Sequence, residues 1–205
     1  MITVIAGVNG AGKSSIAGAR IRETGGEYFN PDEIARSLRE HNPELSQYEA
    51  NAQAWKIGYD HLVKAITHNK DYTFETTLGG NSITRLLRDA IGSDVQVRIF
   101  YCGLLSAELH IERVRYRVSK GGHDIPEDTI RERYTRSIHN MMTLLPDCYQ
   151  VEVIDNSAAS IDGRPVIRKL FSVKTGKIKI LEQSMPDWAK PLAATGLKNF
   201  TPDMV

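Results

Sequence analysis

The sequence predicts an α/β protein whose strands form a mostly parallel sheet. Short apolar runs alternate with longer segments in which apolar residues recur every three or four positions, the order expected when helices connect parallel strands. The runs that predict strands span residues 2–6, 27–30, 71–76, 95–102 and 150–155. We therefore expect a five-stranded parallel sheet flanked by helices, within a single domain that spans residues 1–205.

Four of the intervening segments carry an apolar stripe of helical spacing, and we interpret the aromatic and methionine residues in these stripes as core. The stripes are Tyr48, Ala52, Trp55, Tyr59, Leu62 and Ile66; Ile83, Leu86, Leu87, Ala90 and Ile91; Ile111, Val114 and Val118; and Ile130, Tyr134, Ile138, Met141 and Leu145.

The C-terminal part of the chain has a different pattern. Two apolar runs, residues 166–173 and 178–181, flank Lys174-Thr175-Gly176-Lys177, which predicts a C-terminal β-hairpin over about residues 164–182 with Gly176 in its turn. A short helix is expected near residues 186–194. Neither an internal repeat nor a low-complexity linker interrupts the chain, which favours one domain.

Composition and charge exclude several classes of protein. The formal net charge is +1, so no field of the whole molecule attracts nucleic acid or an acidic membrane. No stretch approaches the roughly 20 apolar residues of a membrane span, and the chain opens directly into an apolar strand without a basic leader. Two cysteines in 205 residues favour a reducing compartment. These features predict a cytoplasmic protein, with no membrane partner and with nucleic acid an unlikely one.

The most specific motif follows the first strand directly. Residues 7–14 read G-V-N-G-A-G-K-S and match the P-loop pattern G-x-x-x-x-G-K-[ST] at every position. Glycines let backbone N–H groups surround phosphates, and the following helix N-terminus adds partial positive charge. The motif predicts binding of ATP or GTP, with Lys13 on the β- and γ-phosphates and the Ser14 hydroxyl on Mg²⁺. The expected nucleotide-binding residues are Gly7, Asn9, Gly10, Ala11, Gly12, Lys13, Ser14 and Ser15.

A candidate catalytic base follows the second predicted strand. Pro31 suits the first position of a helix, which makes Asn30 a plausible N-cap and places Asp32 in the first turn. In a parallel sheet this strand end shares an edge with the P-loop, where a carboxylate can accept the proton of an attacking hydroxyl. The alternative is that Asp32 only interacts with the helix dipole.

The third predicted strand ends in Glu75-Thr76-Thr77 at the same edge. Glu75 could hold Mg²⁺ through water or bind substrate hydroxyls, and the two threonines could donate hydrogen bonds to either. Asp155 ends the last predicted strand and is a rival acid. We rank Glu75 higher because two hydroxyl residues and then Gly79-Gly80 follow it, as a ligand-binding loop requires.

Residues of about 106–142 predict a helical lid. Helical spacing places Arg113, Arg117 and Lys120 on one face, and Arg133, Arg136 and Asn140 on a second face opposite the apolar stripe; Gly121-Gly122 and His123 lie between them. Such a lid can close over ATP, with Arg117 and Arg133 stabilising charge on the transferred phosphoryl group. The alternatives are two solvated faces, or a groove for RNA, which the near-neutral charge disfavours.

Taken in order, four motifs resemble the zeta-toxin family of P-loop kinases over roughly residues 1–157. They are the P-loop, Phe29-Asn30-Pro31-Asp32, Phe74-Glu75-Thr76-Thr77, and the segment Gly121-Gly122-His123-Asp124-Ile125-Pro126 followed by Arg131-Glu132-Arg133-Tyr134. His123 departs from the pattern, because an arginine is expected before the proline. The predicted C-terminal hairpin lies outside these motifs.

The resemblance implies an ATP- and Mg²⁺-dependent kinase that phosphorylates the sugar 3′-hydroxyl of a UDP-N-acetylamino sugar and acts as a toxin restrained by a small antitoxin. It implies that Asp32 is the general base, that Glu75 is the acid near the sugar substrate, and that Lys13 and Ser14 bind ATP and Mg²⁺. We also assign Thr76, Thr77 and His123 to the substrate site. Two alternatives stay open: a polynucleotide or other metabolite kinase, and a nucleotide-dependent binding module without catalysis.

Overall fold

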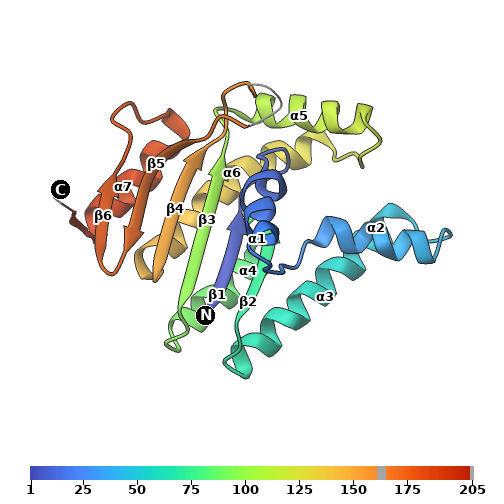
Figure 1. Cartoon of the computed structure of the whole chain (residues 1–205), viewed down its shortest axis with the longest axis horizontal. Helices are drawn as coiled ribbons and strands as arrows, with labels where there is room; N and C mark the ends of the chain where they lie inside the picture. Colours follow the sequence, from blue (N-terminus) through green and yellow to red (C-terminus); the bar gives the residue numbers. More distant parts are fainter. Residues whose placement is uncertain (161–164, 204–205) are drawn as a thin grey trace.

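The computed structural model describes residues 1–160 and 165–203, and within this part of the chain seven strands form one mixed sheet (Figure 1). Their order is β2-β1-β3-β4-β5-β6-β7. The strands are β1 (Ile2–Ala6), β2 (Tyr72–Thr76), β3 (Val97–Gly103), β4 (Gln150–Asp155), β5 (Arg168–Lys174), β6 (Lys177–Ile180) and β7 (Thr201–Pro202). The first four are parallel, whereas β5 is antiparallel to β4 and β6. Since β1 lies between β2 and β3, the P-loop lies at the carboxyl edge of the sheet with a parallel strand on either side.

The prediction of five parallel strands is therefore wrong in detail. Residues 27–30 form no full strand: Phe29 alone makes a parallel bridge with Phe74, its N–H donating to the Thr73 carbonyl at 2.9 Å. The physical reason is that Asn30 caps a helix that begins at Pro31, so the chain leaves the sheet after one residue. The other four predicted strands agree with the structure to within two residues.

The predicted C-terminal hairpin exists, and it belongs to the main sheet. β5 pairs along β4 with a bulge at Val153 and Ile154, so the hairpin extends the parallel strands instead of standing apart from them. Its turn has positive φ at Thr175 (+49°) and Gly176 (+75°), as the tight turns preferred in hairpins require. Residue 164, the predicted start of the hairpin, lies outside the described residues.

The helices divide into two layers and a projecting pair. One face of the sheet is covered by α4 (Asn81–Ile91), α6 (Glu127–Leu144) and α7 (Lys190–Asn199), and the π-helix η1 (Ser14–Gly18) and α1 (Ala19–Glu23) lie on the other face (Figure 1). α2 (Pro31–His41) and α3 (Gln47–Thr67) pack together beside the sheet, and α5 (Ala107–Ser119) lies above its carboxyl edge. Short 3₁₀ turns, η2 (Leu145–Asp147) and η3 (Asp187–Ala189), precede β4 and α7. None of the helices described is long and apolar enough to cross a membrane.

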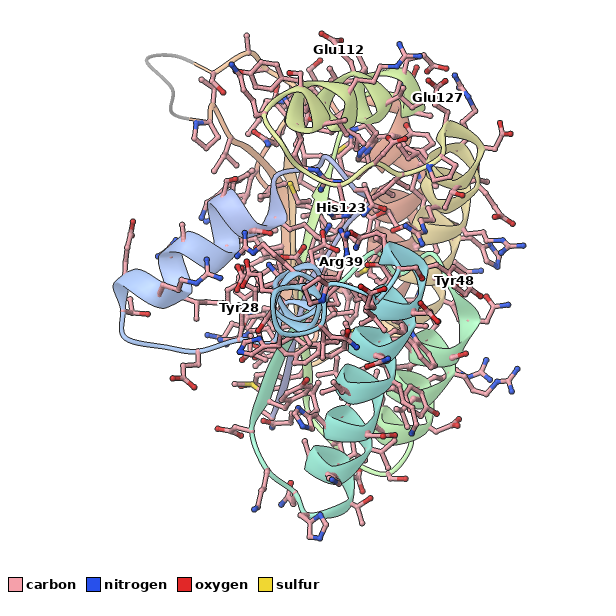
Figure 2. All side chains as sticks on the ribbon, turned by 90° about the vertical axis from the view of Figure 1, so that its right-hand side faces the viewer. Tyr28, Arg39, Tyr48, Glu112, His123 and Glu127 are labelled. Carbon is pink, nitrogen blue, oxygen red and sulfur yellow. The ribbon has the colours of Figure 1, made fainter. Side chains whose placement is uncertain are left out.

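The predicted stripe on α3 is wrong for two of its aromatic members. Tyr48 at the start of the helix (Figure 2) is 84% exposed, and Trp55 is 49% exposed. Small residues form the buried face instead, namely Ala50, Ala54, Gly58 and Ala65 together with Leu62. Close packing explains this choice, because a Cβ atom at Gly58 would lie 2.5 Å from the Phe29 ring. Tyr48, Trp55 and Tyr59 occupy a neighbouring face of the helix, which borders the cavity described below.

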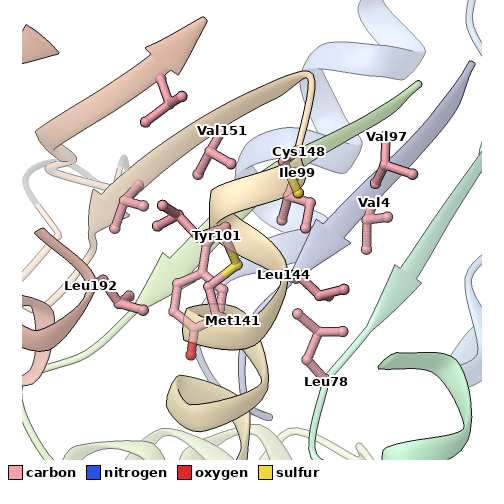
Figure 3. Packing of buried hydrophobic residues seen from close by; sticks show 14 of the residues in the cluster. Val4, Leu78, Val97, Ile99, Tyr101, Met141, Leu144, Cys148, Val151 and Leu192 are labelled. Carbon is pink, nitrogen blue, oxygen red and sulfur yellow. The ribbon is translucent and has the colours of Figure 1, made fainter. Parts of the chain in front are cut away.

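The main core lies between the sheet and α6, where the predicted stripe on that helix is confirmed (Figure 3). Met141 and Leu144 are buried against Tyr101 of β3, whose hydroxyl is 2.9 Å from the Ser137 hydroxyl. From Ser137 onward α6 therefore belongs to the fixed core. The predicted lid, which ran to residue 142, is too long at this end, because burial of a continuous apolar stripe fixes the helix to the sheet.

Candidate functional site

The P-loop has the backbone geometry that phosphate binding requires. Gly7, Gly10 and Gly12 have φ values of +138°, +84° and +90°, which side-chain-bearing residues rarely adopt. A Cβ atom at Gly7 would lie 2.1 Å from the Cys102 carbonyl oxygen, and one at Gly10 would lie 2.8 Å from the His110 carbonyl oxygen. The motif glycines are thus required both by conformation and by the close approach of β3 and α5.

Contacts from neighbouring elements hold the P-loop from outside. The Ala11 carbonyl accepts hydrogen bonds from the Asn156 amide (2.9 Å) and the Cys102 thiol (3.0 Å), and the Asn9 carbonyl is 2.8 Å from His110 Nδ1. Sequence reasoning missed these three partners. The contact of Asn156 could have been predicted, because this residue directly follows β4 at the edge of the sheet where the P-loop was expected.

His110 is buried, and burial, reinforced by Lys13 and Arg113, lowers the pKa of its imidazole to about 4. The ring is therefore neutral near pH 7. Because the Asn9 carbonyl can only accept, Nδ1 carries the proton and donates. α5 is thus tied to the P-loop by a hydrogen bond between uncharged groups.

Glu75 at the end of β2 contacts both chemical groups of the P-loop. Its Oε2 accepts a hydrogen bond from Ser14 Oγ at 2.8 Å, and its Oε1 lies 3.4 Å from Lys13 Nζ. Lys13 and Glu75 are both buried, so the pair is shielded from solvent. By contrast, the Ser15 side chain is exposed and makes none of these contacts.

Asp32 lies in the first turn of α2, where Asn30 caps the helix by accepting a hydrogen bond from the Asp32 N–H at 3.0 Å. Two lid residues approach its carboxylate: Arg117 Nη1 and His123 Nε2 each lie 3.8 Å away. Arg117 also donates to the His123 carbonyl at 3.0 Å, which fixes the loop between α5 and α6. Burial lowers the pKa of His123, an effect that Asp32 opposes.

Arg133 connects α6 to the P-loop and to the loop after β2. Its Nη1 donates to the Asn9 side-chain oxygen at 2.8 Å, and a Cβ atom at Gly79 would come within 2.6 Å of its Cγ. Burial lowers the pKa of its guanidinium, and the charge of Asp32 opposes that shift. Arg133 therefore lies where the sequence placed it, near the phosphate end of the site.

The remaining lid cations do not converge as predicted. Arg113 donates to the Ala158 carbonyl at 3.2 Å, Lys120 lies over the Tyr116 ring, and Arg136 pairs with Glu132 at 2.8 Å. Each of them finds a local partner.

Asn140 does not belong to the polar face of the lid at all. It is buried, and its amide donates to the carbonyls of Leu78 (2.7 Å) and Gly80 (3.3 Å). The prediction erred because the helix turns this face of α6 toward the loop after β2, where an amide satisfies free carbonyl groups.

Asp155, the rival acid, is buried beside the hairpin. It pairs with Arg168 at 3.1 Å and accepts hydrogen bonds from the Ser157 backbone and side chain. These contacts join the end of β4 to β5. Glu75, and not Asp155, is the acid that contacts the P-loop.

A cavity of about 660 Å³ opens between the P-loop, α2, α3 and the start of α6. Asn9 and Glu75 line the cavity where it meets the P-loop, which we call its phosphate end. The other lining residues, among them Asp32, Thr76, Thr77, His123 and Arg133, border the rest of the cavity, which we call its acceptor end. Figure 2 looks toward this side, with His123 above α3 and Tyr48 on that helix. The two threonine hydroxyls accept hydrogen bonds from the N–H groups of Leu78 and Gly79, and so shape the loop that borders the cavity. The catalytic and substrate candidates Asp32, Glu75, Thr76, Thr77, His123 and Arg133 thus border one opening together with Asn9 of the P-loop.

Comparison with known proteins identifies the family. The family model described as an AAA domain (AAA_33) matches residues 2–137, and the chain belongs to this family of P-loop kinase-like domains. An uncharacterized protein of Haemophilus influenzae is 33% identical over 128 residues, which cover 62% of this chain and 88% of that protein.

Solved structures share the fold at low sequence identity. The crystal structure of AvrRxo1-ORF1:-ORF2 with ATP matches with a TM-score of 0.64 at 15% identity; the match covers 100% of this chain but only 64% of that one. A structure from the PezAT chromosomal toxin–antitoxin system of Streptococcus pneumoniae matches with a TM-score of 0.50 at 14% identity, covering 74% of this chain and 65% of that one. At these identities the likeness concerns the fold alone.

Proposed function

We propose that this chain is an ATP- and Mg²⁺-dependent kinase that transfers the γ-phosphate to a hydroxyl group of a small acceptor. The observation that carries the proposal is the position of Glu75, which contacts Lys13 and Ser14 and also lines the cavity that contains Asp32. A nucleotide in the P-loop would present its terminal phosphate to that cavity. A hydrolase that used water as its acceptor would need no cavity of about 660 Å³ there.

In the proposed reaction the acceptor oxygen forms a bond to the γ-phosphorus, and the bond from that phosphorus to the bridging oxygen of ADP breaks. Asp32 takes the proton of the acceptor hydroxyl. Arg117 and His123, each 3.8 Å from the Asp32 carboxylate, orient it. Arg117 and Arg133 stabilise the charge on the transferred group.

The residues present fit both nucleotide and metal. Positive φ at Gly7, Gly10 and Gly12 gives the loop the backbone conformation of a phosphate cradle, and the similar structure of AvrRxo1-ORF1:-ORF2 contains ATP. Hydroxyl and carboxylate oxygens are the ligands that Mg²⁺ prefers, and Ser14 Oγ lies 2.8 Å from Glu75. Ser14 would ligate the ion and Glu75 would hold it through water. Bound Mg²⁺ supplies charge that neutralises the β- and γ-phosphates.

For the acceptor we propose a UDP-N-acetylamino sugar, and for the biological role a toxin restrained by a small antitoxin. The motifs shared with zeta toxins support both. The likeness to the PezAT toxin–antitoxin system and to AvrRxo1-ORF1, whose structure includes ORF2, supports the biological role alone. A polynucleotide kinase is the second candidate. Its acceptor requires a basic groove, whereas the cavity is lined by four acids, Asp32, Glu75, Asp124 and Glu132, against two arginines and His123.

A phosphotransfer screen tests the proposal. The protein is incubated with γ-labelled ATP, Mg²⁺ and one acceptor at a time: UDP-N-acetylglucosamine, gluconate, or an oligonucleotide with a free 5′-hydroxyl. We expect label on a small acceptor, lost in Asp32→Asn and retained in Asp60→Asn, a control aspartate on α3 outside the cavity. Label on the oligonucleotide alone would favour the second candidate, and no transfer to any acceptor would favour a binding module.

A further inference from the structure

Part of one face of the sheet has no helix over it. The opposite face is covered by α4, α6 and α7, whereas η1 and α1 together span only residues 14–23 (Figure 1). On the side of η1 and α1, no helix of residues 1–160 and 165–203 lies over β4, β5 and β6. Parallel strands such as β3 and β4 usually have helices on both faces. We call this uncovered surface the open face.

The strand register shows which side chains the open face carries. Residues paired across neighbouring strands point to the same face, and successive residues of one strand point to opposite faces. Val151 and Val153 of β4 are buried in the main core, so the residues that alternate with them, and their partners on β3, β5 and β6, point to the open face. Among these residues are Phe100, Ile154, Lys169, Lys174, Lys177 and Lys179.

The hairpin gives the open face a positive charge. Residues 165–182 contain five basic residues and one acidic residue, although the net charge of the whole chain is only +1. Lys169 and Lys177 have acidic partners at 3.1 and 3.7 Å, whereas Lys174 and Lys179 have none among the described residues. Lysine on an edge strand discourages aggregation, but Lys174 lies on β5, which is paired on both sides. Edge protection therefore does not explain the charge of this face.

The inner part of the open face is apolar. Phe100 on β3 and Ile154 on β4 are diagonal neighbours on adjacent strands, and both are partly exposed. The Arg98 guanidinium lies 5.3 Å from the centroid of the Phe100 ring. Covering apolar side chains is favourable in proportion to the area removed from water. The open face thus combines an apolar centre with a basic outer part, which is complementary to an apolar stripe flanked by acidic residues.

We propose that the open face docks an acidic amphipathic helix of a partner protein. Such a helix would complete the layer that the described chain leaves open, because helices cover the faces of the sheet in α/β folds. Its apolar stripe covers Phe100 and Ile154, and its acidic residues face Lys174 and Lys179. β4 has six residues, and a helix of about 14 residues matches its length of about 20 Å.

The inference does not rest on the proposed function. β2, which borders the cavity, lies at one end of the sheet, and β5, β6 and β7 lie at the other. A partner on the open face therefore leaves the cavity free for nucleotide and acceptor.

Fluorescence anisotropy on the whole chain, without nucleotide, tests the open face. The first probe is a labelled synthetic helix of about 14 residues with leucine on one face and glutamate on the other. The second has lysine in place of glutamate, and the third is a single-stranded oligonucleotide of similar length. At an ionic strength of about 0.15 M, where distant exposed charges are screened, we expect the acidic helix to bind most tightly.

Substitutions on the open face should weaken binding of the acidic helix. The double variant Lys174→Glu, Lys179→Glu should lower its affinity by about tenfold or more, because two attractions become repulsions. Ile154→Thr, which keeps a β-branched residue in the strand, should lower it severalfold. The control Lys70→Glu, Lys198→Glu changes the net charge equally and should have little effect. Lys70 precedes β2 at the other end of the sheet, and Lys198 lies on α7, which covers the opposite face.

No binding of the acidic helix, equal binding of the acidic and basic helices, or equal losses in the two double variants would overturn the proposal. Tighter binding of the oligonucleotide would assign the open face to nucleic acid and reject a protein partner. The substituted lysines are at least partly exposed, and unchanged circular dichroism and ATP affinity verify that each variant keeps its fold. Because the measurement needs neither nucleotide nor acceptor, its result is distinct from that of the phosphotransfer screen.

Discussion

The phosphate end and the acceptor end of the cavity are built in different ways. The phosphate end is made of backbone: three glycines with positive φ, a buried Lys13, and carbonyl groups held by Asn156, Cys102 and His110. The acceptor end is made of side chains on helix faces, several of them exposed, such as those of Tyr48 and Trp55. A phosphate site made of backbone groups needs particular residue types, such as glycine, at fixed positions. Exposed side chains on helix faces can be substituted without loss of the fold. We infer that the phosphate end defines the reaction class and that the acceptor end defines the substrate.

Two residues connect the phosphate end of the cavity with its acceptor end, and substitutions there test whether the two ends act separately. Glu75 contacts the P-loop and the cavity together, and Arg133 reaches from α6 to the Asn9 side chain. Substitutions that affect only the acceptor end should leave nucleotide affinity unchanged. Substitutions at the junction should affect both.

The largest effect is expected from Asp32→Asn. The amide preserves size and can still lie between Arg117 and His123, but it cannot accept the hydroxyl proton. We expect kcat to fall by about 10² or more with ATP affinity retained. Steady-state turnover together with ATP titration checks this, and a variant with wild-type turnover would return Asp32 to a role at the helix N-terminus only.

Arg117→Ala and Arg133→Ala should each lower kcat by about tenfold or more, because preorganised cations matter most when charge develops on the transferred group. Arg133→Ala should also weaken ATP binding modestly, since it releases Asn9 of the P-loop. Arg115→Ala is the matched control: its guanidinium pairs with Glu127 away from Asp32. Equal, small effects of all three substitutions on turnover would contradict a catalytic role for the lid.

His110 should make the phosphate end sensitive to acid. Its folded pKa of about 4 lies below the ordinary 6.5, so the unfolded chain binds the proton first as pH falls. The free energy of unfolding is therefore unaffected by this group above about pH 6.5 and falls progressively toward pH 4. At pH 5 the loss amounts to about 2 kcal/mol. Denaturant unfolding between pH 7 and 4 measures it. In His110→Asn, whose amide can still donate to Asn9, the slope of stability against pH should be smaller; an unchanged slope would exclude His110 as its source.

Asn140→Leu should affect the acceptor end alone. Leu78 is buried with φ +51°, and Asn140 holds this conformation by hydrogen bonds to the Leu78 and Gly80 carbonyls. Without them the loop that carries Thr77 and Gly79 shifts, and we expect the acceptor KM to rise about fivefold while the ATP KM stays constant. His139→Leu, at the exposed neighbouring position, is the control. A parallel rise of both KM values would mean general destabilisation instead.

The same division explains what the sequence could predict. The P-loop, the N-cap at Asn30 and the strands β1 and β4 depend on local chemistry, which is legible in a single chain. The prediction of a strand over residues 27–30 failed because the pairing of a strand depends on where the next helix begins. The α3 stripe failed because two columns of that helix have helical spacing, and only the contact of Gly58 with Phe29 decides which one is buried.

Asn140 and Trp55 show the limit most clearly. Asn140 on α6 follows polar spacing yet serves the loop after β2, more than sixty residues away in sequence, which no local pattern reports. Trp55 is of a residue type that usually packs in the core, yet it lines the cavity. Both belong to the acceptor end, where function depends on which helix faces meet across the cavity.

The most direct test of the central claim is a calorimetric titration of Mg²⁺·ATP into the wild type, Lys13→Ala and Asp32→Asn. If the two ends are separate, the wild type and Asp32→Asn should bind ATP with closely similar affinity, and Lys13→Ala should lose binding. Absence of ATP binding by the wild type, or equal binding by all three proteins, would contradict the assignment of the P-loop as the nucleotide site and the kinase proposal with it.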